Sequence, residues 1–291
     1  MKQQNKAVFI TFEGIDGCGK STQIAWLSTA LKELGVGFVR LREPGGNAIS
    51  EKVRALLLDP ANTEMTAEAE LLLYEASRAQ NVRQAIEPAL EAGTVVLCDR
   101  FFDSTFAYQA HARGLDEELV RTANKLGSCG FTPDVTIVFD LDPTVAWERA
   151  TRGGADRLEA EGLAFQELVR EGYVRAHELE PERVLLVDAD GTRSEVFVRL
   201  VEALTSVLPA LADLDMDQFL ELQEGVEQAM ATIAVAPAEE TSEDVEEDDT
   251  TSAEQDAEED ELEDEEQDVG QYVEQMMADI EAEAGEGQAD A

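Results

Sequence analysis

Residues Gly14–Ser21 read GIDGCGKS, follow directly on the apolar run Ala7–Glu13 (AVFITFE) and open a helical pattern. This is a full match to G-x-x-x-x-G-K-[ST], the phosphate-binding loop. Its glycines let backbone N–H groups turn inward around phosphate, where the helix N-terminus adds a positive field. Lys20 can reach the β- and γ-phosphates, and the Ser21 hydroxyl can ligate Mg²⁺. A nucleoside triphosphate site is therefore predicted, but not its reaction, because unrelated activities share this loop.

Around this loop, apolar runs of strand length alternate with helical patterns. Strands are predicted at Ala7–Glu13, Gly37–Arg42, Thr94–Asp99, Val135–Asp140 and Arg183–Asp188. Helices are predicted at Lys20–Leu34, Asn47–Leu58, Thr66–Glu91, Asp116–Leu126, Pro143–Thr151, Leu163–Leu179 and Ser194–Leu208, and Pro88 is expected to bend or break the third near its end. Near-continuous apolar strands separated by helices predict an α/β fold, a five-stranded parallel sheet flanked by helices on both faces. Ligands of such sheets bind beyond the C-terminal strand ends.

The charge of the 291-residue chain is concentrated at one end. The net charge is −42, and the 31 acidic residues from Pro209 onward are accompanied by no Lys or Arg. The first 208 residues hold 33 acidic and 22 basic residues, a net of −11, which is ordinary for a soluble domain. A chain this acidic repels nucleic acid phosphates and anionic membranes, so we expect neither as a partner.

The sequence also predicts a cytoplasmic location. No run of about 18 apolar residues is present to span a membrane, and Met1–Lys6 leads into too short an apolar run for a secretory signal. Cys18, Cys98 and Cys129 are widely spaced, odd in number and without His neighbours at metal-ligand spacing. They argue against a disulfide framework or a zinc site and fit a reducing compartment.

Several further motifs occur in a characteristic order. They are Glu13–Thr22 (EGIDGCGKST), Arg42–Gly46 (REPGG), Asp99–Phe101 with Ser104, Ala107–Gln109 (AYQ) and Arg149–Glu159 (RATRGGADRLE). Across roughly residues 7–207 the chain resembles bacterial thymidylate kinases, which are P-loop nucleoside monophosphate kinases. The resemblance implies a kinase domain at residues 1–208, transfer of the ATP γ-phosphate to dTMP to give dTDP for dTTP synthesis, a requirement for Mg²⁺, and a homodimer.

The resemblance also implies which residues contact ATP and the metal. The ATP-binding loop residues are Gly14, Ile15, Asp16, Gly17, Cys18, Gly19, Lys20, Ser21 and Thr22. Lys20 has a catalytic role, and Ser21 and Asp99 hold Mg²⁺. Asp16 lies near the acceptor phosphate as a positioning residue, although an Asx turn within the loop is the alternative.

Other residues are implied in dTMP binding. Arg100 contacts the dTMP phosphate, for which a bidentate guanidinium is well suited; a structural ion pair is its alternative. Tyr74 stacks on thymine and Arg78, four residues on, contacts the carbonyl edge of the base, unless Tyr74 is simply a core aromatic. The remaining positions are Ser104, Thr105, Tyr108 and Gln109 around base and sugar, Arg54 on the phosphate side or merely exposed, and Glu43 in contact with substrate or anchoring its turn.

The glycine-broken segment Arg149–Glu159 suits a mobile lid of about residues 149–162. Family members carry a catalytic arginine in the phosphate loop or in the lid, and here the loop has none. Arg152 is the first choice and Arg149 the second, while Arg157 holds ATP or pairs with Glu159. A plain solvated charge run is the alternative.

The family does not ordinarily have an extension like residues 209–291. Residues Ala238–Asp268 are almost all acidic, Ser, Thr or Ala, and we expect disorder there. Residues Leu211–Met230 are weakly amphipathic, and Val269–Ala284 carries an apolar stripe at helical spacing. The extension either docks on an unknown protein partner or on the kinase, or only solubilises the chain.

Two other functions stay open at this point. The same site could accept another deoxynucleoside monophosphate such as dUMP. The chain could instead be a P-loop regulatory module that uses nucleotide as a switch, although the lid arginines and the Tyr74–Arg78 pair argue against it.

Overall fold

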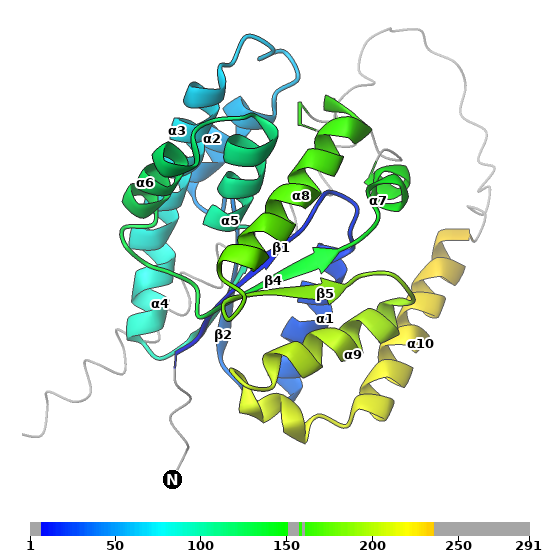
Figure 1. Ribbon diagram of the computed structural model, residues 1–291. Helices are drawn as coiled ribbons and strands as arrows, with labels where there is room; N and C mark the ends of the chain where they lie inside the picture. The colour runs from blue at the N-terminus through cyan, green and yellow to red at the C-terminus, as the bar shows by residue number, and fades with distance from the viewer. Residues whose placement is uncertain (1–6, 151–156, 159–160, 236–291) are drawn as a thin grey trace, which may run out of the picture. The chain divides into compact units, whose positions relative to one another are not determined.

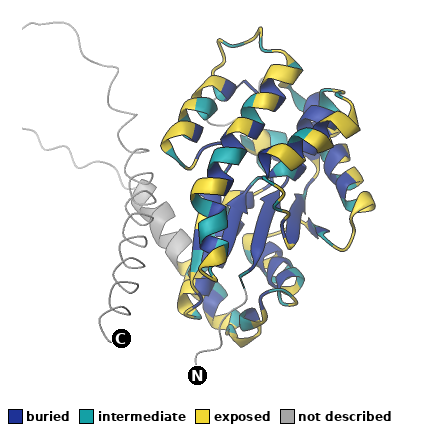
Figure 2. Ribbon diagram, turned by 90° about the vertical axis from the view of Figure 1, so that its left-hand side faces the viewer, coloured by how far each residue is buried: buried dark blue, intermediate teal, exposed yellow. Residues whose placement is uncertain are grey.

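The computed structural model describes residues 7–150, 157–158 and 161–235. Within them five strands form one parallel sheet in the order β2-β3-β1-β4-β5 (Figure 1). The strands are β1 (Phe9–Glu13), β2 (Phe38–Arg42), β3 (Val95–Asp99), β4 (Val135–Asp140) and β5 (Val184–Asp188). Every residue of β1 and β3 is buried, as Figure 2 shows for the middle of the sheet. The predicted fold class is confirmed, because strands buried on both faces are covered by helices on both faces.

Helices cover the two faces of this sheet. The helices are α1 (Lys20–Glu33), α2 (Ala48–Leu58), α3 (Ala67–Asn81), α4 (Glu87–Glu91), α5 (Phe102–Thr105), α6 (Glu117–Gly127), α7 (Pro143–Ala150), α8 (Leu163–Leu179), α9 (Arg193–Leu204) and α10 (Met216–Val235). Helices α1 and α9 pack together on one face, and α4 and α8 contact strands from the other (Figure 1). Helices α2, α3 and α6 lie side by side beyond that second face.

The long helix predicted at Thr66–Glu91 is interrupted earlier than expected. Between α3 and α4 the chain forms a π-helical turn, Val82–Ile86, and Pro88 lies in the first turn of α4. Proline has no N–H to offer the carbonyl four residues before it, and its ring crowds that carbonyl. The wider π-helical turn immediately before Pro88 accommodates the missing N–H and the bulk of the ring, so the helix is interrupted before the proline and not at it.

A helical segment that the sequence patterns did not indicate follows Arg100. Helix α5 runs directly into a π-helix, η2 (Phe106–Ala112), which carries Tyr108 and Gln109. A search for a 3.6-residue period misses a π-helix because its turn is wider. These wide turns recur at functional sites, and this one forms part of a pocket wall.

The core continues past residue 208, the boundary expected from the charge distribution. A 3₁₀ turn, Pro209–Asp213, buries Leu211, and α10 buries Phe219 to 1 % exposure. The Phe219 ring stacks on Phe197 of α9 at 5.0 Å and lies 6.4 Å from the Trp26 ring. The first part of the acidic extension is therefore built into the same compact unit as the sheet, and that unit ends at Ala234.

The predicted helix at 269–284 and the acidic stretch before it lie outside the described residues, and both stay predictions. In the portion of the chain that the structure describes, no helix combines the length and apolarity needed to cross a membrane.

Candidate functional site

The phosphate-binding loop connects the end of β1 to the start of α1. Gly19 caps α1 without any side-chain hydrogen bond, so the first N–H groups of the helix remain available to an anion. Helix α7 lies against the loop. A Cβ atom placed on Gly17, whose φ is +81°, would lie 2.1 Å from the carbonyl oxygen of Ala146. Both backbone conformation and space therefore require glycine at position 17.

A cavity of about 710 Å³ opens over this loop. Seven of the nine predicted loop residues line it, Asp16 through Thr22, and so does Arg149 from the end of α7. The opposite wall comes from the loop after β5 and from α9, which sequence reasoning missed: Ala189, Gly191, Thr192, Arg193 and Val196. The signal in the sequence was the capping box of Thr192 and Glu195, which marks where α9 begins.

The chemistry of the side chains at the end of β3 fits a magnesium ion. Asp99 is buried and lies 3.4 Å from the Lys20 ammonium, and the Ser21 hydroxyl donates to its other oxygen at 3.4 Å. Hydroxyl and carboxylate oxygens are ligands that Mg²⁺ prefers, and it commonly takes only one or two from the protein beside phosphate oxygens. Among the described residues no cluster of three or more His, Cys, Asp or Glu could hold a metal. The fit is thus to a nucleotide-bound metal.

A second, smaller cavity of about 100 Å³ adjoins the first. Eight of the nine predicted substrate residues line it: Glu43, Arg54, Tyr74, Arg100, Ser104, Thr105, Tyr108 and Gln109. Pro44, Leu58 and Leu158 complete the wall and were not anticipated. Asp16 lines both cavities, which places its carboxylate between them.

Arg100 and Asp16 form a charged pair at this junction. The Arg100 Nη2 lies 2.5 Å from Asp16 Oδ1, and the Tyr108 hydroxyl donates to the other carboxylate oxygen at 3.2 Å. Burial acts to raise the pKa of Asp16, but Arg100 and Lys20 outweigh it and lower that pKa below its ordinary value. Asp16 is therefore ionised at neutral pH, and the pair can orient groups on either side of it.

Arg78, which the resemblance implies in contact with the base, does not line the second cavity. Its side chain is 1 % exposed and lies behind the cavity wall. Its Nε donates to Glu43 at 2.9 Å, Nη1 to Glu75 at 2.5 Å and Nη2 to Thr105 at 2.8 Å. A buried guanidinium needs such partners, and they draw it in between α3 and the residues that form the wall.

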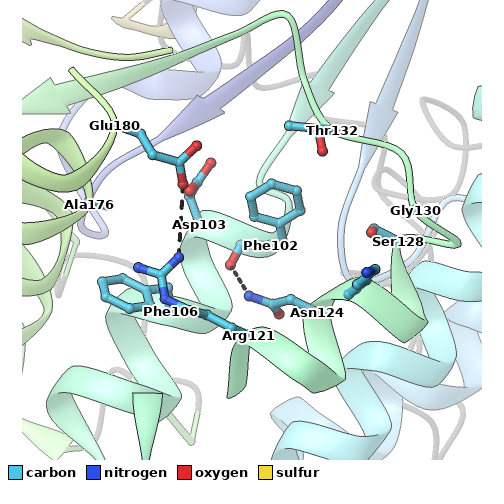
Figure 3. A pocket seen from close by; sticks show the side chains of 11 residues that line it. Phe102, Asp103, Phe106, Arg121, Asn124, Ser128, Gly130, Thr132, Ala176 and Glu180 are labelled. Atoms are coloured by element: carbon cyan, nitrogen blue, oxygen red, sulfur yellow. Dashed lines mark hydrogen bonds and ion pairs between the residues drawn. The ribbon is translucent and has the colours of Figure 1, made fainter. Parts of the chain in front are cut away.

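Two of the groups that fix Arg78 were not predicted. Glu75 is buried on α3, and Asn124 of α6 accepts from Nη1 at 3.4 Å while its amide donates to the Phe102 carbonyl at 3.1 Å. Figure 3 shows Asn124 and Phe102 at the wall of a further cavity, which is lined by Phe102 and Asp103 of α5 and by none of the phosphate-loop residues. Helix α5 thus separates the two cavities, and the amide of Asn124 connects it to Arg78.

Of the predicted lid, the structure describes residues 149–150, 157–158 and 161–162. Arg152 and Glu159 lie outside the described residues. Arg157 does not line the cavity over the phosphate loop: its guanidinium donates to Glu70 of α3 at 2.6 Å and to the Leu57 carbonyl at 2.6 Å. The same carboxylate of Glu70 accepts from Gln109 and Arg113. In this structure Arg157 thus anchors Leu158 against the smaller cavity, and its role in ATP binding stays a prediction.

Comparisons with known proteins agree on one family. The family model described as Thymidylate kinase matches residues 12–199. A thymidylate kinase of Desulfosudis oleivorans is 48 % identical over 208 residues, covering 69 % of this chain and 97 % of that protein. One from Symbiobacterium thermophilum is 47 % identical over 203 residues, 70 % and 95 % of the two chains. The crystal structure of thymidylate kinase from Ehrlichia chaffeensis matches with a TM-score of 0.56 and 33 % identity, covering 68 % of this chain and 98 % of that one.

Proposed function

The chain belongs to the thymidylate kinase family and phosphorylates dTMP to dTDP with ATP, and from this premise we propose how its two cavities divide the reaction. The larger cavity, over the phosphate loop, takes ATP, and the smaller one takes dTMP. The Asp16–Arg100 pair at the junction of the two cavities supports this assignment, because the reacting phosphates must meet there. The proposal includes the resident metal, Mg²⁺, held by Ser21, Asp99 and the ATP phosphates.

On the donor side, the N–H groups of the loop and the start of α1 receive the ATP phosphates, with Lys20 beside the β- and γ-phosphates. Mg²⁺ held by Ser21 and Asp99 would supply positive charge that offsets the negative charge of the triphosphate. Arg149 reaches this cavity from α7 and stands ready to neutralise charge on the transferred group, and Arg152 remains the alternative.

On the acceptor side, Arg100 binds the dTMP phosphate and Asp16 orients the guanidinium. An oxygen of that phosphate attacks the γ-phosphorus, the bond from the γ-phosphorus to the bridging oxygen breaks, and ADP leaves with the electron pair. The side chains contribute alignment and charge neutralisation and need no covalent intermediate.

Base selection rests on Arg78. Described protein groups take four of its five N–H donors: Glu43, Glu75, Asn124 and Thr105. The fifth, on Nη2, lies behind the cavity wall beside Thr105, and a carbonyl oxygen of the base reaches it through a shift of that wall when dTMP binds. Thymine and uracil offer such an oxygen, whereas cytosine presents an amino donor there. The 5-methyl group separates dTMP from dUMP by about 10- to 200-fold at most, so dUMP is the runner-up acceptor.

ADP release with MgATP and each of dTMP, dUMP, dCMP, dGMP and UMP tests this assignment. We expect dTMP to react fastest, dUMP to follow by about 10- to 200-fold, and dCMP and a reaction without acceptor to be negligible. Equal rates with dTMP and dCMP would refute the role of Arg78. Equal rates with and without acceptor would instead favour a nucleotide-switch module.

We also propose a homodimer through α2, α3 and α6. These helices pack side by side (Figure 1) and carry five exposed large apolar side chains: Ile49, Leu56, Leu72, Leu119 and Leu126. Leu126 is 79 % exposed and Leu72 is 64 % exposed. An apolar surface of this kind marks an association site, and a two-fold axis places the same patch on both partners.

Leu72→Glu should therefore convert a dimer to a monomer, because two like charges would face each other across the two-fold axis. Light scattering coupled to gel filtration measures the mass directly. Leu222→Glu is the matched control, because Leu222 is 55 % exposed but lies on α10. A wild-type monomer at micromolar concentration would contradict the proposal.

A reducing cytoplasm is proposed as the location, and the free state of Cys18, Cys98 and Cys129 supports it. The acidic residues beyond Val235 remain either a solubilising tail or a docking segment for a protein partner. Deleting residues 236–291 and assaying solubility and dTMP turnover together separates these two roles.

A further inference from the structure

Glu13 is a carboxylate without exposure to solvent at the end of β1. Its side chain is 0 % exposed, and among the described residues no cation pairs with it directly. Instead it accepts three hydrogen bonds: from the Phe101 N–H at 2.8 Å, from the Tyr173 hydroxyl at 3.0 Å and from the Ser104 hydroxyl. Burial and the neighbouring charge of Asp103 raise its pKa to about 7, although Arg100 and these hydrogen bonds act to lower it. A buried acid of this kind is costly, and its partners indicate what it achieves.

The two hydroxyls carry the connection onward to Arg100. Arg100 Nη1 donates to the Tyr173 hydroxyl at 3.0 Å and to the Ser104 hydroxyl at 3.2 Å. Both hydroxyls accept from Arg100 and donate to Glu13, so the hydrogen bonds all run in one direction, from guanidinium to carboxylate. Glu13 is the terminal acceptor. The Ser104 and Tyr173 hydroxyls also lie 2.9 Å from each other, so without Glu13 one of them could donate to the other, but the second proton would have no acceptor in the chain.

The backbone of Arg100 depends on the same carboxylate. Its φ is +69°, a left-handed conformation that few residues other than glycine adopt. Its N–H is held by the Phe12 carbonyl at 2.9 Å, and the next N–H, of Phe101, is held by Glu13. The two hydrogen bonds come from neighbouring residues of β1 and flank the unfavourable φ, which stabilises it.

Two sets of contacts hold the side chain of Arg100, and binding of the acceptor phosphate affects them differently. Its Nη2 meets Asp16 at the junction of the cavities, where an arriving phosphate has to share that guanidinium. Its Nη1 is held from behind by Ser104 and Tyr173, on the side of Glu13. The second set of contacts can persist while the first rearranges.

We propose that Glu13 is the positioning residue of Arg100: it fixes the backbone through Phe101 and the guanidinium through Ser104 and Tyr173, so that Arg100 keeps its orientation when the acceptor phosphate comes to share the guanidinium with Asp16. This rests on the proposed binding of the dTMP phosphate by Arg100. It extends the site to Glu13 and Tyr173, which sequence reasoning did not assign to it.

The test is Glu13→Gln, an isosteric change. In one orientation the new amide N–H₂ faces the Phe101 N–H, and in the other it faces hydroxyls that already accept from Arg100. We expect about a tenfold rise in KM for dTMP and about a tenfold fall in kcat, with KM for ATP within about twofold of the wild type. Tyr173→Phe should reproduce part of the effect, and adding it to Glu13→Gln should cause little further loss.

Thr136→Val is the matched control. Thr136 is buried on the neighbouring strand β4 and bonds Asp103, so its loss lowers the melting temperature without touching Arg100. The proposal would be overturned if the melting temperature fell equally in Glu13→Gln and Thr136→Val while the dTMP kinetics of Glu13→Gln stayed unchanged. Glu13 would then have a structural role alone. If Glu13→Gln does not fold, an unchanged KM for dTMP in Tyr173→Phe would likewise overturn the proposal. Failure of the wild type to prefer dTMP would refute the proposed function instead.

Discussion

Arg100→Lys should lower kcat/KM for dTMP by about 100- to 1000-fold, the range found when one preorganised donor to a developing charge is removed. Lysine keeps the positive charge but has no planar fork. It cannot bind a phosphate bidentately while also holding Asp16 on one nitrogen and the Ser104 and Tyr173 hydroxyls on another. Both residues pay a similar cost at a φ of +69°, so backbone strain does not account for the difference.

Steady-state kinetics with saturating MgATP measures this effect, and the KM for ATP reports whether the donor side is intact. Arg83→Lys is the control, since the Arg83 side chain is 58 % exposed and forms its ion pair with Glu87 on the same helical stretch. A fall of less than about fivefold for Arg100→Lys would mean that charge alone suffices at the acceptor phosphate.

Arg78→Met should destabilise the protein by about 3–5 kcal/mol, because it leaves two buried carboxylates without their cation. Arg78 is 1 % exposed, and Glu43 and Glu75 pair with it at 2.9 Å and 2.5 Å. Burial already raises the pKa of Glu43 to about 7 against the opposing effect of Arg78, and removing Arg78 raises that pKa further. At about 2–4 °C per kcal/mol for a domain of this size, the melting temperature should fall by roughly 10 °C.

The stability lost in Arg78→Met should also depend on pH, and it should increase as the pH rises. A carboxyl whose pKa is raised on folding contributes stability below its unfolded pKa, and that contribution is lost as the pH rises through the folded value. The deficit of Arg78→Met against the wild type should therefore grow between pH 5 and pH 8. Adding Glu75→Gln should recover part of it by removing one orphaned charge. Thermal melts at both pH values measure the two effects, and a deficit independent of pH would mean that lost packing dominates.

The sequence predicted the fold well because its signals were local. Phosphate-loop spacing and buried strands such as Val95–Asp99 are read from neighbouring residues, and the sheet order then places their ends at one edge. Local patterns could not show the placement of side chains whose partners are distant in the sequence. Arg78 is drawn behind the wall by Glu43 and Asn124, 35 and 46 residues away, and Arg157 is claimed by Glu70, 87 residues away.

The contribution of Glu13 was hidden for a related reason. It appeared in the sequence only as the residue before the loop, and nothing local marks it as the acceptor for Phe101 and Tyr173, 88 and 160 residues further on. The domain boundary at residue 208 was placed by charge alone. Charge could not show that Phe219, within the acidic extension, has an aromatic contact with Trp26 near the other end of the chain.

That aromatic contact makes Trp26 a natural fluorescence reporter for α10. Trp26 lies on α1 and is 5 % exposed, and its ring contacts Phe197 of α9 and Phe219 of α10. If α10 detaches, water reaches the indole and its emission shifts to the red, while the phosphate loop at the other end of α1 is left in place. With Trp147 of α7 replaced by Phe, one chromophore would follow how the extension joins the enzyme, in real time and without a label.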